Sequence, residues 1–448
     1  MSFQQGLSGL STSSKALDVI SNNVANSSTV GFKSSDAHFA DVYAASLTGG
    51  SALQVGIGTA LSSVAQQYTQ GNVSTTNNPL DIAINGSGFF RLSNAGAVTY
   101  SRNGQFHLDK SGYFINDQNL RLTGYPASQD GTIRKQTPTE MQITPDLLKL
   151  APVATGKSVG GSYAGVQMSV NLDSRVTSKT WTPPTGGVPN IDPNNYNYST
   201  ALSVYDSLGN PHTMSFYYVK TATAGQWAVY GNVDGTLMDG AAPADKPNLT
   251  TPILLNFDNA GKLTSVDGVA VPASGTVPDV ALNVNLDQVA TNLGRTPWGS
   301  APLAFNLNFA GTSQYGAAFA TNRLQQDGYS SGNLAGMAVG SDGIIQGRYS
   351  NGQTRNIGQL VLASFQNPNG LANIGGNQWI ETSVSGQPTV DAPGSGQMGA
   401  VQSNAVEESN VDLTGELVKM ITQQRNYQAS AQSIKTQDQI MQTLVNLR

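Results

Sequence analysis

The sequence contains no cysteine, few charged residues and no long hydrophobic run. Without cysteine there can be no disulfide, no thiolate metal ligand and no cysteine nucleophile. Charged residues make up 11% of the 448 residues, less than half of the roughly 25% found in average soluble proteins. The net charge is −5 and no block of Lys or Arg occurs, so nucleic acid is not an expected partner.

Segments for membrane insertion or secretion are also missing from the sequence. No stretch approaches the roughly 18 consecutive apolar residues that cross a membrane as a helix, so membrane insertion is not expected. The first cation is Lys15, and no basic segment precedes an apolar run at the N-terminus, so any export should occur without a cleaved signal peptide. Hydrophobic residues make up 38% of the chain, which is enough for folded domains with cores.

Motifs for catalysis, cofactors and metals are not found. The histidines His38, His107 and His212 lie far apart, and none belongs to a metal-binding spacing. Gly56-Ile57-Gly58 and Gly86-Ser87-Gly88 lack the third glycine of a dinucleotide site. No P-loop occurs, and no G-x-S-x-G elbow precedes a helix. The adjacent Glu407 and Glu408 are interpreted as a solvated face rather than an acid/base pair. We therefore expect no enzyme, no cofactor and no metal site.

Proline and tryptophan divide the chain into two ends and a middle. All 20 prolines and all four tryptophans lie between Pro79 and Pro393. Residues 10–30 contain neither Gly nor Pro, and residues 411–448 contain only Gly415. The two ends therefore predict long helices, whereas the Gly-rich turns and short β-branched or aromatic runs of the middle predict strands.

Both ends carry apolar residues at alternating spacings of four and three, which predicts a helical seam. At the N-terminus these positions are Phe3, Leu7, Leu10, Leu17 and Val24, with Ser14 and Ser21 completing the spacing. At the C-terminus they are Leu413, Leu417, Met420, Tyr427, Ala431, Ile434, Met441 and Val445, with polar breaks at Gln424 and Asp438. We refer to these apolar residues as the predicted seam.

Two interpretations of the predicted seam are open. Each stripe could pack on the core of its own domain, or the stripes could associate with further copies of the chain. Ser, Ala and Gln weaken the seam of an isolated pair, and a weak pair gains stability from additional copies, which favours self-association. Ser2 with Gln5, and Ser409 with Asp412, have the spacing of capping boxes that would start the two helices.

The middle predicts β hairpins around short turns. Asn94-Ala95-Gly96, Asn103-Gly104 and Lys110-Ser111-Gly112 separate short alternating runs, and Asn-Gly is the strongest short hairpin signal. Similar turns occur at Ser207-Leu208-Gly209-Asn210 and Ser350-Asn351-Gly352.

The predicted fold class is mainly β with α-helical termini, in which an inner β domain is interrupted by an inserted outer β domain. The terminal helices would form a coiled coil on assembly. The predicted segments are 1–24 and 411–448 for the terminal helices, 25–75 and 405–410 for a connector, 76–150 and 327–404 for the middle β domain, and 151–326 for the inserted outer β domain.

The ends resemble the bacterial flagellar rod and hook axial proteins. The N-terminal signature runs from Ser8-Gly9-Leu10 through Ser21-Asn22-Asn23-Val24-Ala25-Asn26 to Gly31-Phe32-Lys33. The C-terminal one runs from Glu408-Ser409-Asn410-Val411-Asp412-Leu413 through Gln424-Arg425-Asn426-Tyr427 to Leu444-Val445-Asn446-Leu447. Gly86-Ser87-Gly88-Phe89-Phe90 through Tyr100-Ser101-Arg102-Asn103-Gly104 is similar to the family's first β domain, and Val204-Tyr205-Asp206-Ser207-Leu208-Gly209-Asn210 resembles the outer domain of its hook members.

The resemblance implies a homo-oligomer of many copies in a helical tube, the flexible universal joint that transmits torque from rod to filament. It implies export through the flagellar type III apparatus and a place in the hook of the basal body, outside the cell. It also implies the hook cap protein, the distal rod, the hook–filament junction proteins and the hook-length ruler as partners. The motif and connector residues that it marks are Asn22, Asn23, Asn26, Gly31, Phe32, Asn410, Asp412 and Arg425.

Two other functions stay open at this point. A distal rod subunit would share the ends and the first β domain, but rod proteins lack an insertion of this length. A β-rich surface adhesin or fibre protein would use the middle to bind a ligand and the ends only as an anchor.

Overall fold

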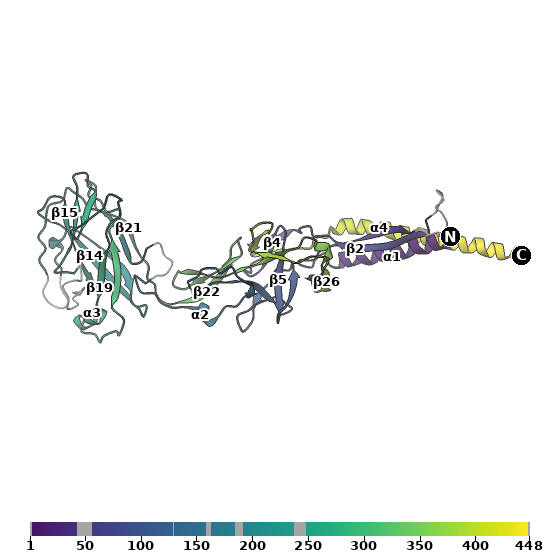
Figure 1. Ribbon diagram of the computed structural model, residues 1–448, viewed down its shortest axis with the longest axis horizontal. Coiled ribbons are helices and arrows are strands. Elements are labelled where there is room, and N and C mark those ends of the chain that lie inside the picture. The colour runs from purple at the N-terminus through teal and green to yellow at the C-terminus, as the bar shows by residue number, and fades with distance from the viewer. Residues whose placement is uncertain are drawn as a thin grey trace. The chain divides into compact units, whose positions relative to one another are not determined.

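The computed structural model describes residues 2–42, 56–128, 130–157, 163–183, 191–236 and 248–446, which form two compact units (Figure 1). The first unit comprises residues 1–144, 336–348 and 354–448, and the second comprises residues 145–335 and 349–353. The predicted fold class, mainly β with helical termini, is confirmed. The predicted division of the chain into terminal helices, connector, middle β domain and outer β domain stays a prediction.

Two long helices, α1 (Ser2–Ala25) and α4 (Leu413–Asn446), lie side by side in the first unit (Figure 1). Residue Asp412 caps α4, because its Oδ1 accepts a hydrogen bond from the backbone N–H of Thr414 at 3.0 Å. The predicted capping box with Ser409 as N-cap is therefore wrong. Its hydroxyl instead accepts from the N–H of Val411, before the helix begins.

A β hairpin of β1 (Ser35–Val42) and β2 (Gly58–Gln66) lies along α1. Its strands are antiparallel, with Ser35 opposite Gln66, and a bulge follows His38. The hydroxyls of Thr12 on α1 and Thr59 on β2 are hydrogen-bonded at 3.1 Å. Much of the predicted connector is thus an ordered hairpin packed on the helix.

The β part of the first unit is built around one antiparallel sheet and two short strand pairs. The sheet has the order β23 (Ile344–Tyr349), β24 (Thr354–Leu360), β9 (Arg121–Pro126), β5 (Phe89–Asn94), β6 (Ala97–Ser101), β27 (Gln378–Ile380) and β26 (Ala372–Gly375), with β7 (His107–Leu108), β8 (Phe114–Ile115), β10 (Thr139–Glu140), β25 (Leu362–Ser364) and β28 (Thr389–Asp391) attached to it. The two pairs are β4 (Ile82–Asn85) with β29 (Ala400–Ser403), and β3 (Val73–Thr75) with β30 (Ala405–Glu407). A short 3₁₀ turn, Pro368–Gly370, precedes β26.

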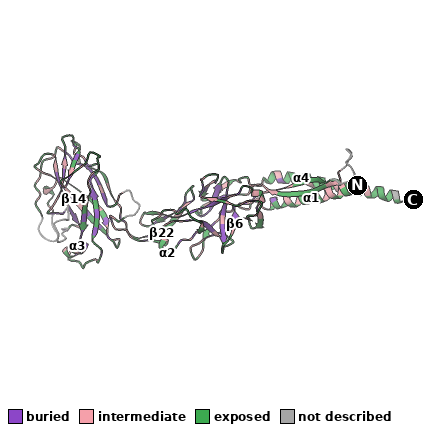
Figure 2. Cartoon of the chain, in the orientation of Figure 1, coloured by how far each residue is buried: buried purple, intermediate pink, exposed green. Residues whose placement is uncertain are grey.

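Aromatic side chains fill the core of this β part. Phe89, Tyr100, Phe365 and Trp379 are buried together, and the ring of Phe89 meets that of Trp379 edge-on at 5.5 Å between centroids. Figure 2 shows that buried residues concentrate in the β sheets, whereas α1 and α4 are mostly intermediate or exposed. The β part therefore has its own core, independent of the helices.

The second unit packs a six-stranded sheet against a four-stranded sheet. The six strands, in order, are β13 (Tyr198–Tyr205), β14 (Pro211–Lys220), β15 (Gln226–Val233), β16 (Ile253–Phe257), β17 (Leu263–Val266) and β18 (Val269–Ala270). The four are β19 (Val280–Val284), β20 (Leu303–Asn308), β12 (Val166–Asn171) and β21 (Ala320–Gln326). The unit also contains α2 (Pro145–Leu148), α3 (Leu286–Asn292) and a 3₁₀ turn at Pro193–Asn195.

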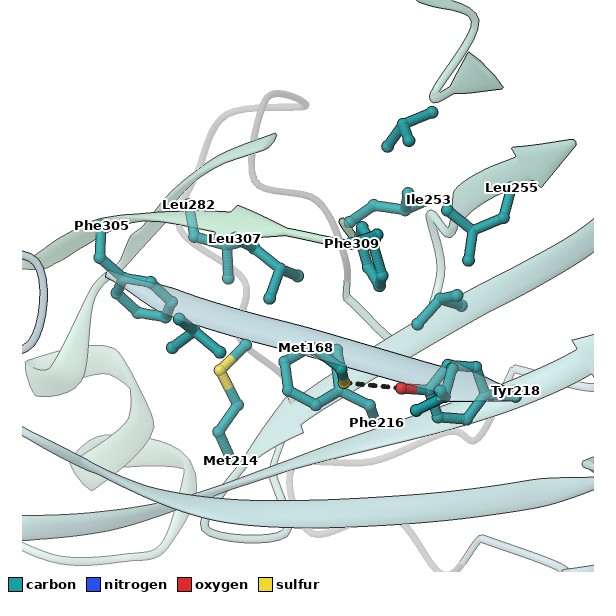
Figure 3. Close-up of a cluster of buried hydrophobic side chains, with 14 of the residues drawn as sticks. Met168, Met214, Phe216, Tyr218, Ile253, Leu255, Leu282, Phe305, Leu307 and Phe309 are labelled. Atoms are coloured by element: carbon teal, nitrogen blue, oxygen red, sulfur yellow. Dashed lines mark hydrogen bonds between the residues drawn. The ribbon is translucent and has the colours of Figure 1, made fainter. Parts of the chain in front are cut away.

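The core between these two sheets is apolar and closed to solvent (Figure 3). Met168, Phe216, Tyr218, Leu307 and Phe309 are all at most 1% exposed. The only polar side-chain atom drawn there is the Tyr218 hydroxyl, which donates a hydrogen bond to the Met168 sulfur at 2.7 Å (Figure 3).

The two strands that lead into and out of the second unit are paired. β11 (Lys149–Leu150) is antiparallel to the start of β22 (Gly332–Val339), with Leu150 opposite Gly332. Further along, the Thr155 hydroxyl donates to the side-chain oxygen of Gln326 at 3.0 Å. The insertion therefore begins and ends at neighbouring points of the structure.

Four turns share one local design that the sequence already contains. An Asp or Asn side chain accepts hydrogen bonds from the backbone N–H groups two and four positions later, and the residue three positions later has positive φ. The side chains are Asp109, Asn116, Asp206 and Asp258, and the positive-φ residues are Gly112, Asn119, Gly209 and Gly261. Such turns close hairpins by purely local bonds.

The predicted hairpin at Asn103-Gly104 is wrong. Strand β6 ends at Ser101 and pairs with β5 and β27, not with the strand that follows the Asn-Gly pair. The Gly104 carbonyl instead accepts from the N–H of Ile82 at 2.9 Å, and a side chain at Gly104 would collide with the Ile82 carbonyl. The glycine is needed for a close backbone crossing rather than for a turn.

Candidate functional site

The contact between α1 and α4 uses a face of small residues on α1. A Cβ added at Gly6 would lie 2.9 Å from Ile434, and one added at Gly9 would lie 3.0 Å from the Ser430 hydroxyl, so the helices approach closely there. The buried residues of the same face are Ser13, Ala16, Ile20 and Asn23. Each of these six residues immediately precedes a position of the predicted N-terminal spacing, so the intrachain contact is rotated by about 100° from it.

The predicted seam of α1 faces away from the hairpin. Phe3 and Leu7 are 51% and 53% exposed, and Leu10, Leu17 and Val24 are partly buried. The hairpin contacts come from Gln5, whose amide donates to the Gly56 carbonyl, and from Ser8 and Thr12. Phe3 and Leu7 each lie two positions from Gln5, about 200° around the helix, and Leu10 lies two positions from Ser8.

The predicted seam of α4 is divided between the surface and the helix contact. Ile434 packs on Gly6 and is partly buried, as are Met420 and Ala431. The exposed members are Leu413, Leu417, Tyr427, Met441 and Val445. The structure thus brings part of the predicted seam into the helix pair and leaves most of its large apolar side chains at the surface of the first unit.

The family-motif residues gather where the helices join the β part. The Asn23 amide N–H₂ donates to the Ser35 carbonyl at 2.8 Å and to the Glu416 carboxylate at 3.1 Å, linking α1 to the hairpin and to α4. The Asn410 side chain accepts from the Ser34 N–H at 2.8 Å and donates to the Gln67 carbonyl at 2.7 Å. These two asparagines therefore tie both chain ends to the hairpin.

The remaining motif residues have different surroundings. Asn26 extends the end of α1 by donating to the Asn22 carbonyl, and Phe32 is partly buried in the turn that follows. Gly31 has φ +71, and a Cβ there would lie 2.6 Å from the Asn103 nitrogen, so only glycine fits. Asp412 caps α4, and Arg425 is exposed on that helix.

A buried charged cluster of Lys33, Arg102 and Glu407, the junction cluster, lies beside these motif residues. The Lys33 amine is 2.6 Å from one Glu407 oxygen, and the Arg102 guanidinium is 3.1 Å from the other. All three side chains are at most 3% exposed. The first Glu407 oxygen also accepts from the Gly71 N–H at 2.9 Å.

The junction cluster joins four separate segments of the chain. Lys33 follows α1, Gly71 follows the hairpin, Arg102 belongs to the β part, and Glu407 ends β30 just before α4. The Lys33 amine also donates to the Thr69 carbonyl, and Arg102 donates to the Gly86 carbonyl. Two cations share one carboxylate, so each cation depends on Glu407 for its charge balance.

Burial governs the ionisation of the junction cluster. Loss of water lowers the pKa of the Lys33 amine, and the Glu407 carboxylate partly offsets this effect. Burial also lowers the pKa of the Arg102 guanidinium, again opposed by Glu407. Removing the carboxylate would therefore leave two desolvated cations close together.

Sequence reasoning missed this cluster. The interpretation of Glu407 as part of a solvated face is wrong, because its strand β30 pairs with β3 and turns the carboxylate inward, whereas Glu408 is exposed. A usable signal was present: Lys33 is the only Lys or Arg between Lys15 and Arg91. A single cation in a segment with so few charges indicates that the side chain has a structural role, such as a buried ion pair.

Within the described ranges, no group of three or more His, Asp or Glu side chains is arranged to hold a metal ion. Among the same residues, no helix has both the length and the apolar character needed to cross a membrane. His212 is buried and its Nδ1 lies 2.7 Å from Asp234, an arrangement that fixes the turn after β15.

Four segments match known domain families. The flagella basal body rod protein family matches residues 3–33, and the flagellar hook protein FlgE/F/G D1 domain matches residues 83–156. The flagellar basal body protein FlaE D2 domain matches residues 171–329, and the flagellar basal body rod FlgEFG protein C-terminal family matches residues 402–447.

Similarity to individual proteins extends over the whole chain. The flagellar hook protein FlgE of Salmonella typhimurium is 40% identical, with 100% of both chains covered. That of Treponema pallidum is 32% identical over 99% of this chain and 98% of its own. A crystal structure of Helicobacter pylori flagellar hook protein FlgE2 has a TM-score of 0.48 and 15% identity, covering 75% of this chain and 100% of that one. On the strength of the full-length identities, the chain belongs to the flagellar hook protein family.

Proposed function

We propose that this protein is the structural subunit of a bacterial flagellar hook, a flexible helical tube of many copies that transmits torque from rod to filament. The observation that carries the proposal is the surface of the helix pair. Its internal contact uses small residues, while Phe3, Leu7, Leu413 and Leu417 stay about half exposed. Large apolar side chains on two neighbouring helices are suited to bury one another between copies.

The junction cluster supports the same function from within the subunit. A torque-transmitting subunit needs a firm connection between the helices that hold it in the tube and the β part outside them. Lys33, Arg102 and Glu407 join the chain segments at that point through buried, charge-assisted hydrogen bonds, which are stronger than neutral ones. Such a connection resists rotation better than a single exposed linker.

Partners and location follow as part of the proposal. The subunit would be exported by the flagellar type III apparatus and assembled beneath the hook cap protein. It would contact the distal rod at one end and the hook–filament junction proteins at the other, with a ruler protein setting the length. Full-length identity to hook proteins favours this function over a distal rod subunit and over a surface adhesin.

Electron microscopy of the concentrated protein tests the proposal. The full-length chain should form tubes, and a chain ending at Ser409, which lacks α4, should not. Leu417→Asp should block tube formation while the β domains stay folded, because it would place a charge in the apolar contact. Gln428→Asp, at an exposed polar position of the same helix, is the matched control. Normal tubes from Leu417→Asp would exclude the predicted seam as the contact.

A further inference from the structure

The last turns of α4 extend beyond the level of Ser2, the residue at which α1 begins (Figure 1). Asn23 lies against Glu416, Gly9 against Ser430 and Gly6 against Ile434, which is an antiparallel register. The same register places Ser2, where α1 begins, level with about residue 438 of α4. Figure 1 shows the C-terminal end of α4 projecting past the N-terminal end of α1. We call residues 439–446 the overhang.

The overhang keeps the apolar face of the paired region. Met441 and Val445 follow Ile434 by seven and eleven positions, so they lie on the same side of α4 as the residue that packs on Gly6. They are 61% and 71% exposed. The apolar face of the overhang is therefore the face that contacts α1 in the paired region, and Met441 and Val445 lie beyond that region.

An apolar groove lies at the other end of the helix pair, between α1, α4 and β1. It encloses about 240 Å³, and its apolar lining includes Val19, Ile20, Phe39 and Val418. Phe39 and Val418 are exposed although they line a hollow in the molecule. Lys419 and Asp36 form an ion pair of 3.2 Å among the lining residues.

We propose that the overhang of one copy packs into the groove of a second copy, with Met441 and Val445 as the inserted side chains. This inference rests on the proposed self-assembly and specifies one of its contacts. The occupant is a second copy because the face of the overhang continues an interface that α4 already makes within the chain, the one with Gly6 and Gly9 of α1.

The polarity of the assembly follows from the positions of the two surfaces. The groove centre near Met420 and the overhang centre near Thr443 are separated by 23 residues of α4, or about 35 Å. One chain therefore cannot fill its own groove through a straight helix. A contact between two different surfaces is head-to-tail, and repetition of such a contact gives an open polymer rather than a closed dimer.

Disulfide trapping tests the contact, and the absence of cysteine from the natural chain makes every cross-link attributable. Thr422 lines the groove, so the double variant Thr422→Cys/Val445→Cys should cross-link in assembled tubes under mild oxidation. A ladder of dimers, trimers and larger species is expected on a non-reducing gel. Cross-links within one chain are excluded, since a disulfide needs Cα atoms within about 7 Å.

The matched control is Gln424→Cys/Val445→Cys. Gln424 is exposed at the same height of α4 but lies two positions from Thr422, about 200° around the helix. Tubes of the Thr422 variant that give no ladder, or a stronger ladder from the Gln424 variant, would overturn the proposed contact. Failure of the unmodified protein to form any tube would instead overturn the proposed self-assembly, and the contact with it.

A second measurement covers the case in which the cysteine variant does not assemble. Val445→Ala removes apolar surface without adding a reactive group and should raise the critical concentration for tube formation by roughly tenfold. Gln442→Ala, which removes an exposed side chain of the same helix end, should leave that concentration within about twofold. Equal values for the two variants would contradict the inference.

Discussion

Substitution of Glu407 by Gln should be among the most destabilising single changes in the first unit. The amide keeps the size of the side chain but loses the charge that Lys33 and Arg102 share at 2.6 and 3.1 Å. Breaking a buried ion pair by removing one partner costs about 3–5 kcal/mol. Since domains are stable by only about 5–15 kcal/mol, the first unit would lose a large fraction of its stability.

Calorimetry of the full chain can measure this loss, because the second unit has a separate core and its transition serves as an internal reference. Glu408→Gln is the matched control. Its carboxylate is exposed and accepts one hydrogen bond from Asn72, so the cost should stay below about 1 kcal/mol. Equal effects of the two substitutions would refute the reasoning that Glu407 holds the junction together.

The same substitution has a predictable pH dependence. Burial already lowers the pKa of Lys33 from 10.5, and loss of Glu407 removes the interaction that raises it. A base whose pKa is lower in the folded than in the unfolded state favours folding above its unfolded pKa, and this contribution is lost as pH falls through the folded value. The defect of Glu407→Gln should therefore shrink as pH rises toward about 10, which unfolding curves at several pH values can test.

Three further predictions concern the second unit. Met168→Leu should cost about 1–3 kcal/mol because the buried Tyr218 hydroxyl loses its acceptor, and the cost should fall in a Tyr218→Phe background, as denaturant titration can show. Arg175 holds the pKa of Asp173 at about 2, a contribution present above pH 3.8 and lost as pH falls through about 2, so Arg175→Ala should shift acid unfolding to higher pH. Several opposed Lys/Glu pairs introduced within 151–326 should stiffen or straighten the assembled tube, because ion pairs between neighbouring copies would lock contacts that a flexible tube changes as it bends. Unchanged curvature in micrographs would count against this.

The helices were predictable because their signals are local. Residues 10–30 without Gly or Pro, and 411–448 with only Gly415, leave few alternatives to α1 and α4. The turns after Asp109 and Asp206 were predictable for the same reason, since each side chain bonds to the backbone within four residues. Such hydrogen bonds depend only on residue types within a few positions, so the sequence alone can indicate them.

Features that depend on distant segments were not predictable. Asn103-Gly104 has the composition of a hairpin turn, but the structure uses the glycine where the chain passes Ile82. The face of α1 that meets α4 lies one residue before the positions of the predicted seam, because small side chains, not large ones, allow the close approach at Gly6. Glu407 could not be placed inside without knowing that Lys33 and Arg102 approach it from other parts of the chain.

The paired strands where the second unit begins and ends identify it as an insertion. The first unit is the host domain, and the second unit is the guest domain inserted into it. Because Leu150 lies opposite Gly332 and Thr155 bonds to Gln326, the guest leaves the host at nearly the same place where it begins. A segment inserted in this way can change in length or be exchanged without stretching the host. The architecture would let the guest diversify in evolution while the host keeps its sequence constraints.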